Sequence, residues 1–406
     1  MESSPTSNTF KSYISFWTGQ MFSLLGSSIV QFVVIWWITI ETGSPIYLSI
    51  AAFLGFLPMV VISPIAGVFI DRWNRKLTIA ISDFLQAVIT VWLIFLIMLN
   101  IADIWTIILI NSLRGICQAF HFPAINAIIP IMIPKKHLSR FNGINYFFTG
   151  LINVIGPVVA ASLLLIWSIN EILWIDIITF IIAIFPLLLI KIPLVIEKDK
   201  KRDSFKNDFK LGFNVLQTVP GLLILLILIS AVNFLSVPFH TLLPLFVIVN
   251  HVGTASDLAI VMALIQIGMV FGALLASIKK DWKHRVRVIL LGIVIAAGGY
   301  ITAAISPPGN IIMIGIGGMI RAAMIPIINT NFLTIIQTNV SAETQGRVMS
   351  IVITIASAVS PIGMILSGFI AEAIGIVPLY LTFAALELAS VLITWLFSNV
   401  RHVVYE

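Results

Sequence analysis

The sequence predicts an all-α integral membrane protein whose twelve transmembrane helices form two six-helix pseudo-repeats. Three observations predict this class: the apolar composition, twelve long apolar runs, and a one-sided distribution of Lys and Arg. Of the 406 residues, 59% are hydrophobic and 10% are charged, and the mean hydropathy is +1.10. Soluble domains carry roughly 25% charged residues, so this composition excludes an ordinary soluble fold.

The apolar runs have the length that a membrane-spanning helix requires, about 17–25 residues or more. We place the twelve spans at residues 13–39, 46–70, 77–99, 104–132, 141–166, 171–191, 217–248, 257–279, 286–305, 309–335, 346–370 and 374–398. The first run is too long for a cleavable signal peptide and lacks a small-residue cleavage site behind it. We therefore expect it to stay as the first helix.

The positions of the 23 Lys and Arg residues predict the topology. All but two of them precede the first span or lie in even-numbered loops and the C-terminal tail. The odd-numbered loops carry as formal charges only five acids, namely Glu41, Asp103, Glu171, Asp257 and Glu372. Because Lys and Arg concentrate on the cytoplasmic side, we expect a multi-pass plasma-membrane protein with both termini in the cytoplasm. The basic pI near 9.5 then reflects topology and does not indicate nucleic-acid binding.

The two remaining basic residues, Arg114 and Arg321, lie within spans and indicate an internal repeat. Arg114 precedes Arg140 by 26 positions, and Arg321 precedes Arg347 by the same 26. Parallel six-helix halves are typical of transporters with a substrate site near the bilayer midplane. We expect an N-terminal bundle over 1–190, a C-terminal bundle over 216–406, and between them a cytoplasmic linker over 191–215. The linker is expected to be a solvated tether that can lie along the membrane surface.

Ionisable side chains inside spans are functional candidates, because each costs at least ~2.5–3.5 kcal/mol at the bilayer centre. Arg114 lies about ten residues into its span, and Gln118 and His121 lie close to the same helix face. We interpret them as a polar stripe that lines a cavity and handles a proton and substrate. The alternative is a structural Arg114 satisfied by carbonyl groups and Gln118.

The other buried charges are more ambiguous. Glu387, halfway along the last span, suits either a proton carrier or a neutral acid bonded to a neighbouring helix. Arg321 has no acid near it in the sequence, which favours a structural role. Asp83 is expected to snorkel to the surface or to pair with Arg72 or Arg75, and Asp176 to meet water at the outer end of its span. The complete candidate substrate or proton path is Gln20, Gln31, Glu41, Arg114, Gln118, His121, His240, Arg321, Asn329 and Glu387.

The sequence gives little support to an enzyme. His121 and His240 are isolated and fit hydrogen bonds between helices better than metal binding. The single cysteine, Cys117, excludes a disulfide framework and a Cys-based metal site. Metalloprotease, redox, serine-hydrolase and P-loop motifs do not occur. We therefore predict a non-enzyme without metal or cofactor, with the proton gradient as its energy source.

The loop between the second and third spans is a compact charged segment. It reads Gly67-Val-Phe-Ile-Asp71-Arg72-Trp-Asn-Arg75-Lys76. Gly67 is expected to let another helix approach closely. Asp71 lies at the C-terminal end of its own helix, where an anion is disfavoured, so we expect it to face the positive N-terminus of a different helix.

This loop resembles the corresponding loop of the major facilitator superfamily, whose pattern is roughly G-x-x-x-D-R-x-x-R-K. Other stretches along the whole chain resemble the drug-efflux branch that includes the macrolide exporters: Phe16 to Ser27, Glu41 to Ser44, Arg114 to Pro123, Pro130 to Pro134, and Gln345 to Ser350. Gly156 and Pro157 resemble the antiporter motif that shapes helix packing, although Ala160 and Ala161 stand where that motif has glycines.

The resemblance implies a proton-coupled exporter of hydrophobic or amphipathic compounds that works by alternating access in contact with membrane lipid. We expect it to be a monomer. In the family geometry Asp71 would face the helix that begins near Gln345, Gly346 and Arg347 when the cytoplasmic gate is shut. The expected gate residues are therefore Gly67, Asp71, Arg72, Arg75, Lys76, Gln345, Gly346 and Arg347. A lipid or lysolipid translocator and an importer of a small nutrient remain as alternatives.

Overall fold

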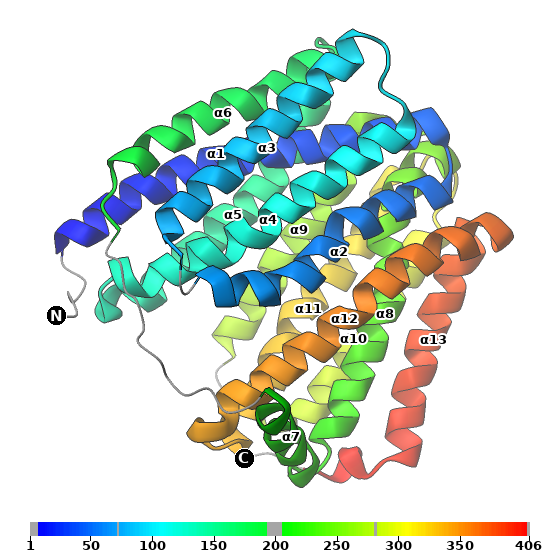
Figure 1. Ribbon diagram of the computed structural model, residues 1–406. Coiled ribbons are helices and arrows are strands. Elements are labelled where there is room, and N and C mark those ends of the chain that lie inside the picture. The colour runs from blue at the N-terminus through cyan, green and yellow to red at the C-terminus, as the bar shows by residue number, and fades with distance from the viewer. Residues whose placement is uncertain (1–6, 71–72, 193–204, 280–281, 404–406) are drawn as a thin grey trace. The chain divides into compact units, whose positions relative to one another are not determined.

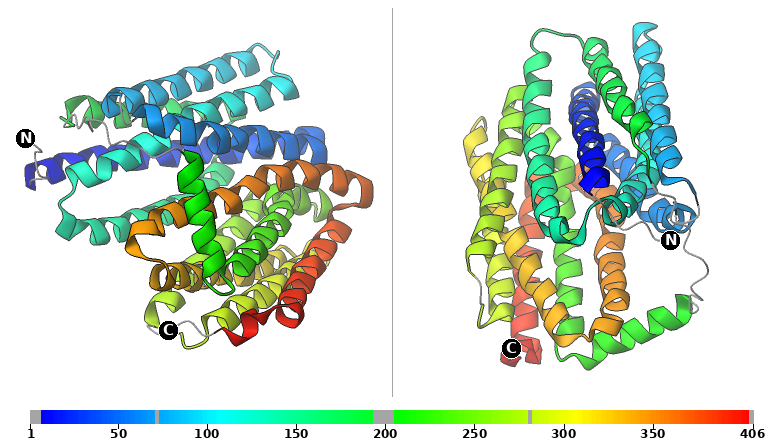
Figure 2. Two further views of the ribbon diagram at one scale, coloured as in Figure 1. Left: turned by 60° about the horizontal axis from the view of Figure 1, so that its bottom comes forward. Right: turned by 90° about the vertical axis from the view of Figure 1, so that its left-hand side faces the viewer.

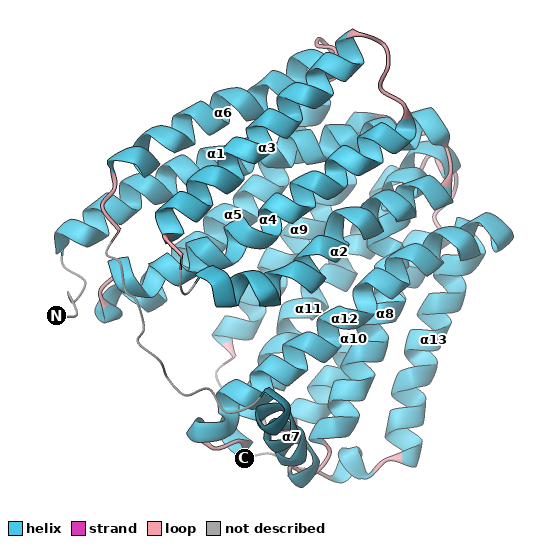
Figure 3. Cartoon of the chain, in the orientation of Figure 1, coloured by secondary structure: helices cyan, strands magenta, loops and turns pink. Residues whose placement is uncertain are grey.

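The computed structural model describes residues 7–70, 73–192, 205–279 and 282–403. Within these ranges every regular element is a helix (Figure 3). The chain divides into two compact units, residues 1–43 with 50–200 and residues 44–49 with 201–406. Each unit is an all-helical bundle, and twelve helices are long and apolar enough to cross a membrane. The predicted fold class is confirmed.

The N-terminal unit contains the first six spans, apart from residues 45–49 of the second span. Its helices are α1 (Ser7–Thr42), α2 (Pro45–Ile70), α3 (Arg75–Met98), α4 (Ile104–Met132), α5 (Lys135–Leu163) and α6 (Ile169–Leu189). Helix α1 packs against α4, α5 and α6, and α3 packs against α4 and α6 (Figure 1). These five helices therefore surround one interior, into which polar side chains can project.

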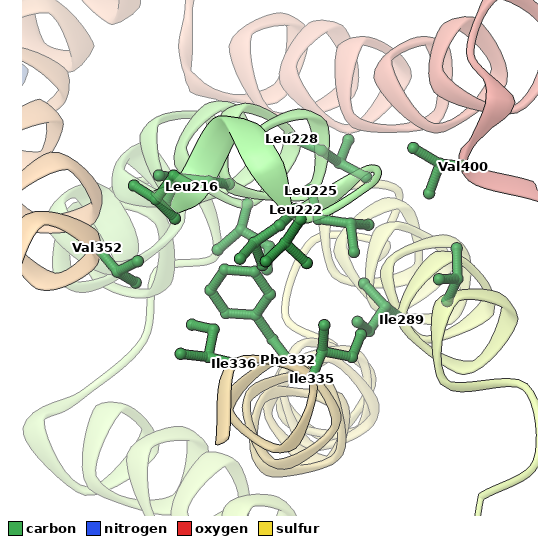
Figure 4. Packing of buried hydrophobic residues seen from close by; sticks show 14 of the residues in the cluster. Leu216, Leu222, Leu225, Leu228, Ile289, Phe332, Ile335, Ile336, Val352 and Val400 are labelled. Carbon is green, nitrogen blue, oxygen red and sulfur yellow. The ribbon is translucent and has the colours of Figure 1, made fainter. Parts of the chain in front are cut away.

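The C-terminal unit contains the other six spans and one shorter helix. Its elements are α7 (Phe205–Thr218), α8 (Leu222–Leu245), the π-helical turn η1 (Phe246–Asn250), α9 (Ala255–Ile278), α10 (Arg285–Ala304), α11 (Ile311–Asn339), α12 (Ala342–Ile374), α13 (Ile376–Phe397) and the 3₁₀ turn η2 (Asn399–His402). Helix α11 packs against α9 and α10, and α8 packs against α12 and α13. A cluster of buried aliphatic side chains around Phe332 fills one end of this unit (Figure 4).

The predicted linker contains a helix that the sequence analysis did not anticipate. Helix α7 occupies residues that we expected to form a solvated tether, and it lies across the end of the C-terminal unit (Figure 2). Leu216 is fully buried in the aliphatic cluster. A Cβ at Gly212 would stand 2.7 Å from Ile351 and 3.2 Å from the Arg347 backbone. Helix α7 is thus packed tightly onto α12, and this part of the tether prediction is wrong.

Glycine allows the closest contact between α10 and α11. A Cβ at Gly299 would stand 2.5 Å from the carbonyl oxygen of Gly317, and a Cβ at Gly317 would stand 2.5 Å from that of Gly299. Real Cβ atoms do not approach backbone atoms this closely, so both positions require glycine. This is the small-residue packing by which membrane helices associate, and it brings Arg321 against α10.

Asp103 caps α4 at its N-terminus. Its carboxylate accepts a hydrogen bond from the Thr106 hydroxyl and another from the Thr106 backbone N–H at 3.0 Å. These two hydrogen bonds lower the pKa of Asp103 below its ordinary value. The cap satisfies a backbone donor that the first helical turn would otherwise leave without a partner.

Candidate functional site

An ion pair joins α4 to α6 inside the N-terminal unit. The Arg114 guanidinium lies 2.7 Å from Asp176 Oδ2 and also donates to the Thr90 hydroxyl. Asp176 accepts further hydrogen bonds from Thr90 at 2.7 Å and from Ser27 at 3.3 Å. All of these partners come from different helices, so one carboxylate ties together α1, α3, α4 and α6.

A second acid, Asp83 of α3, lies beside His121 of α4. His121 Nε2 is 2.9 Å from Asp83 Oδ1 and 3.2 Å from the side-chain oxygen of Gln20. The amide nitrogen of Gln20 donates to Asp83 Oδ2 at 3.1 Å. A carboxylate oxygen and an amide oxygen are both acceptors. Nε2 is therefore the nitrogen of His121 that carries a hydrogen.

The group around Asp176 and the group around Asp83 are two helical turns apart along α1, α3 and α4. Gln20 and Ser27 are seven residues apart on α1, Asp83 and Thr90 on α3, and Arg114 and His121 on α4. At 1.5 Å per residue the two layers are separated by about 10 Å along the helices. Between them Gln118 donates to Gln86 at 3.1 Å. We call this three-layered column the polar ladder; its members are Gln20, Ser27, Asp83, Gln86, Thr90, Arg114, Gln118, His121 and Asp176.

A cavity of about 200 Å³ opens along the polar ladder. Its polar wall is formed by seven members of the ladder: Gln20, Ser27, Asp83, Gln86, Gln118, His121 and Asp176. Apolar and aromatic side chains line other parts of the cavity, among them Tyr13, Phe16, Trp17, Met21, Phe122 and Phe180. Concave sites with mostly apolar walls and a few convergent polar groups are typical of small-molecule binding.

The C-terminal unit holds a second buried ion pair, between Arg321 of α11 and Glu387 of α13. Two guanidinium nitrogens donate to the two carboxylate oxygens, at 2.7 and 3.0 Å. Ser236 of α8 contacts both members of the pair, and Ala296 of α10 offers its carbonyl oxygen to Arg321 at 3.3 Å. The Glu387 side chain is completely buried.

Aromatic rings pack around the C-terminal pair. The guanidinium carbon of Arg321 lies 4.5 Å from the ring centre of Tyr300 and 5.6 Å from that of Phe239. These distances suit a cation–π contact. Tyr300 also packs edge-on against Phe239 and Tyr380. The C-terminal pair is therefore enclosed, with side-chain exposures of 4% and 0%, whereas Asp176 of the N-terminal pair borders a cavity.

The two pairs extend the internal repeat that the sequence showed only for the arginines. In each unit the Arg of the fourth span binds an acid of the sixth, and a serine of the first span donates to that acid at 3.3 Å. Neither ion pair was predicted from the sequence, where Asp176 was expected near the outer end of its span. The signal was present, because Asp176 follows Arg114 by 62 residues and Glu387 follows Arg321 by 66.

The structure corrects two expectations for the acids of the first unit. Asp83 does not reach the basic loop, because it is 5% exposed and bonded to His121 and Gln20. Asp176 is 6% exposed and paired with Arg114, so it does not stand free at the outer end of its helix.

Three of the remaining candidates of the path lie outside the two clusters. Gln31 and Glu41 are exposed positions of α1, and Asn329 is an exposed position of α11. His240 lies on α8, and the centre of its ring is 5.5 Å from the centre of the Phe239 ring. Gln20, Gln118 and His121 line the cavity of the N-terminal unit.

The expected gate loop is only partly described. Asp71 and Arg72 lie outside the described residues, so their predicted roles stay predictions. Arg75 donates to the carbonyl oxygen of Ala127 at 2.9 Å. Lys76 donates to two carbonyl oxygens at the C-terminal end of α6, at 2.7 and 2.8 Å. A cation at that position complements the negative end of the helix dipole.

Four further predicted positions concern the approach of helices. Within their own units, no atom of the described residues lies within 4 Å of a Cβ placed on Gly67 or on Gly346, and the close approach expected at Gly67 stays a prediction. Gln345 and Arg347 are half-buried in the first turns of α12.

The motif residues of α5 are packed in the interior. Gly156 and Pro157 are both buried, and a Cβ at Gly156 would clash with the Ser28 side chain of α1. Ser28 is next to Ser27, so this contact helps to set the position of the Asp176 cluster.

The comparisons with known proteins agree with this architecture. The family model described as Major Facilitator Superfamily matches residues 16–360. The chain belongs to this superfamily. It is 29% identical to macrolide efflux protein A of Streptococcus pyogenes over 365 residues, which cover 90% of each protein. It is 26% identical to the multidrug efflux pump Tap of Mycolicibacterium fortuitum over 380 residues, covering 91% of this chain and 90% of Tap.

Solved structures of this superfamily have the same fold. A bacterial homolog of the human lysosomal transporter Spinster superposes with a TM-score of 0.69 at 16% identity, covering 98% of this chain and 97% of the homolog. The prediction of a multi-pass superfamily transporter, and not an enzyme, is therefore confirmed. Efflux pumps are among its relatives.

Proposed function

We propose that this protein exports a hydrophobic or amphipathic compound across the plasma membrane by alternating access, driven by inward movement of protons. The observation that carries the proposal is the cavity of the N-terminal unit, which combines aromatic walls with two buried acids. The aromatic walls suit an apolar or amphipathic ligand. The acids supply groups that can take up and release protons inside a membrane protein.

The names of the relatives support the proposed direction of transport, which is export, and the proposed substrate class. Macrolide efflux protein A and the multidrug efflux pump Tap align with about nine-tenths of the chain. The placement of Lys and Arg in the even-numbered loops supports a cytoplasmic location for both termini. We take the monomer as the functional unit, because each polar cluster is completed by side chains of a single unit of one chain.

The proposal is tested in proteoliposomes that contain the purified protein and a pH-sensitive dye. Labelled erythromycin, a macrolide, and ethidium, a lipophilic cation, are added to vesicles with an acidic interior. We expect accumulation of at least one probe together with alkalinisation of the interior. Arg114→Ala, which leaves Asp176 without its cation, is expected to abolish both signals.

Other outcomes would redirect the assignment. Probe accumulation without proton movement would replace proton coupling by another driving force. Inactivity toward both probes, combined with movement of fluorescent lipid between leaflets, would favour the lipid translocator. Vesicles without protein provide the background, and Asp257→Asn, a change in a cap between two spans, provides the matched variant.

A further inference from the structure

We propose that Asp83 and His121 form the exchange site of this transporter, where one proton and the ammonium group of an amphipathic amine replace each other. This inference deepens the proposed function and rests on it. The pair holds a proton when the cavity contains only water. It releases the proton to water when a cationic ligand enters and supplies the same positive charge.

The geometry of the pair favours one shared proton. Asp83 receives two hydrogen bonds, one from Gln20 and one from Nε2 of His121, and its side chain is 4% exposed. His121 is more accessible, at 13%. A proton added to the other nitrogen of His121 would convert this contact into an ion pair of a carboxylate and an imidazolium. The same contact therefore persists in both protonation states.

The charge balance shows why the proton is needed. The charged groups that face the cavity are Asp83 and Asp176, with Arg114 behind Asp176. Arg114 neutralises Asp176, which leaves one negative charge on Asp83 if His121 is neutral. A buried charge without a counterion costs several kcal/mol. One proton, or one cationic group of a ligand, removes that cost.

The other helices around the cavity add no further countercharge among the described residues. Helix α5 contributes Asn145 and Thr149, and α1 contributes Tyr13 besides its amides and serines. These groups are neutral in the ordinary pH range. The positive charge that balances Asp83 must therefore come from a proton or from the ligand.

The size of the cavity limits what part of the ligand it holds. Drug-sized ligands occupy sites of about 300–1,000 Å³, and this cavity has about 200 Å³. It therefore suits one substituent of a larger molecule. Rings of Phe16, Trp17, Phe122 and Phe180 line it, and aromatic faces attract ammonium groups. An amine substituent fits both the volume and the charge.

The ion pair of the other unit is a poorer candidate. Glu387 binds Arg321 through both oxygens, and the pair is enclosed by aromatic rings. Protonation of Glu387 would leave Arg321 as a cation without a counterion in the interior. Only the Asp83–His121 pair combines an unbalanced charge with access to a cavity in the described part of the chain.

The test separates coupling from transport. Wild type, Asp83→Asn, His121→Gln and the control Asp257→Asn are reconstituted with labelled erythromycin as the probe. Accumulation driven by a pH gradient and exchange of internal for external erythromycin without a gradient are both measured. Electroneutral exchange of one proton for one cation gives about tenfold accumulation per pH unit.

We expect wild type and Asp257→Asn to show both activities. Asp83→Asn and His121→Gln should retain exchange and lose transporter-dependent accumulation, so that the ratio falls to that of vesicles without protein. Accumulation in Asp83→Asn at the wild-type level would overturn the inference and leave the proposed function intact. Absence of gradient-driven accumulation in wild type would instead overturn the proposed function.

A measurement on the unmodified protein keeps the inference testable if Asp83→Asn fails to fold. Purified wild type in weak buffer is mixed with erythromycin, and the released protons are counted with a dye. Linkage requires about one proton per molecule bound if the two share a site. Binding without proton release would refute the exchange site, whatever the variants do.

Discussion

Replacing Glu387 with Leu, so that Arg321 loses its carboxylate partner, is expected to lower the free energy of unfolding by about 3–5 kcal/mol. Arg321 cannot escape this cost by losing its proton. Its remaining partners are Ser236 at 2.5 Å, the Ala296 carbonyl oxygen at 3.3 Å and the Tyr300 ring. The ring contact recovers up to about 2 kcal/mol and places the loss toward the lower end of the range.

Replacing Arg321 with Met tests the same pair from the other side. The isolated Glu387 keeps only the Ser236 hydroxyl at 3.3 Å, and it can become neutral by taking up a proton. Protonating a carboxyl group at pH 7 costs about 1.4 kcal/mol for each unit above its ordinary midpoint near 4.3, or about 3.7 kcal/mol. Since the folded variant then holds a proton that the unfolded chain releases, its stability should rise as the pH falls.

The assay is equilibrium unfolding in mixed micelles with increasing sodium dodecyl sulfate, at pH 7 and pH 5. Between these values the deficit of Arg321→Met should shrink by about 2.7 kcal/mol, and that of Glu387→Leu should stay constant. The control is the double variant Arg321→Met with Glu387→Leu, which should lie within about 1 kcal/mol of wild type, because a buried pair replaced as a whole is often neutral. Equal, pH-independent losses in both single variants would refute the reasoning.

Three further predictions concern packing, capping and topology. Gly299→Ala should destabilise the protein by about 1–3 kcal/mol, because the added methyl group meets backbone atoms. Gly298→Ala, whose methyl group meets open space, should be neutral or stabilising by up to about 1 kcal/mol. Unfolding in mixed micelles measures both. Asp103→Asn should keep the cap. In wild type, acid protonates Asp103 as the pH falls through its lowered pKa, and the protein then loses stability; the variant should not show this loss, which unfolding below pH 4 measures. In a Cys117→Ala background, Glu372→Cys should react with an impermeant maleimide added to whole cells.

Each of these predictions has a result that contradicts it. Equal stability of the two alanine variants would mean that α10 and α11 do not approach as closely as described. An acid-induced loss of stability in Asp103→Asn equal to that of wild type would place the titrating group elsewhere. Labelling of residue 372 only after permeabilisation would invert the topology, and Lys283→Cys, on the expected cytoplasmic side, is the matched control.

The fold could be predicted from the sequence because the bilayer fixes how long an apolar helix must be. The expected spans at 77–99, 104–132 and 374–398 correspond to Arg75–Met98, Ile104–Met132 and Ile376–Phe397. Helix α7 was missed because its charges made it resemble a tether. Its helical period places Gly212 and Leu216 on one face, a signal that the overall polarity concealed.

Individual residues of the site could be predicted from the sequence, but the contacts between them could not. Depth in the membrane singled out Arg114, His121 and Glu387, since the cost of burying charge does not depend on which helices are neighbours. The partners Asp83 and Asp176 were misread, because pairing depends on which helices pack together. Comparing the two halves over their full length would have linked the sixth and twelfth spans to the arginines.

The seven-residue spacing in the polar ladder has a mechanical consequence. Helices α1, α3 and α4 each contribute one side chain to the layer of Asp176 and one to the layer of Asp83. Sliding or rotating any one helix would break hydrogen bonds in two layers at once. We therefore expect these helices to move as a single body and to keep their register when access changes during transport.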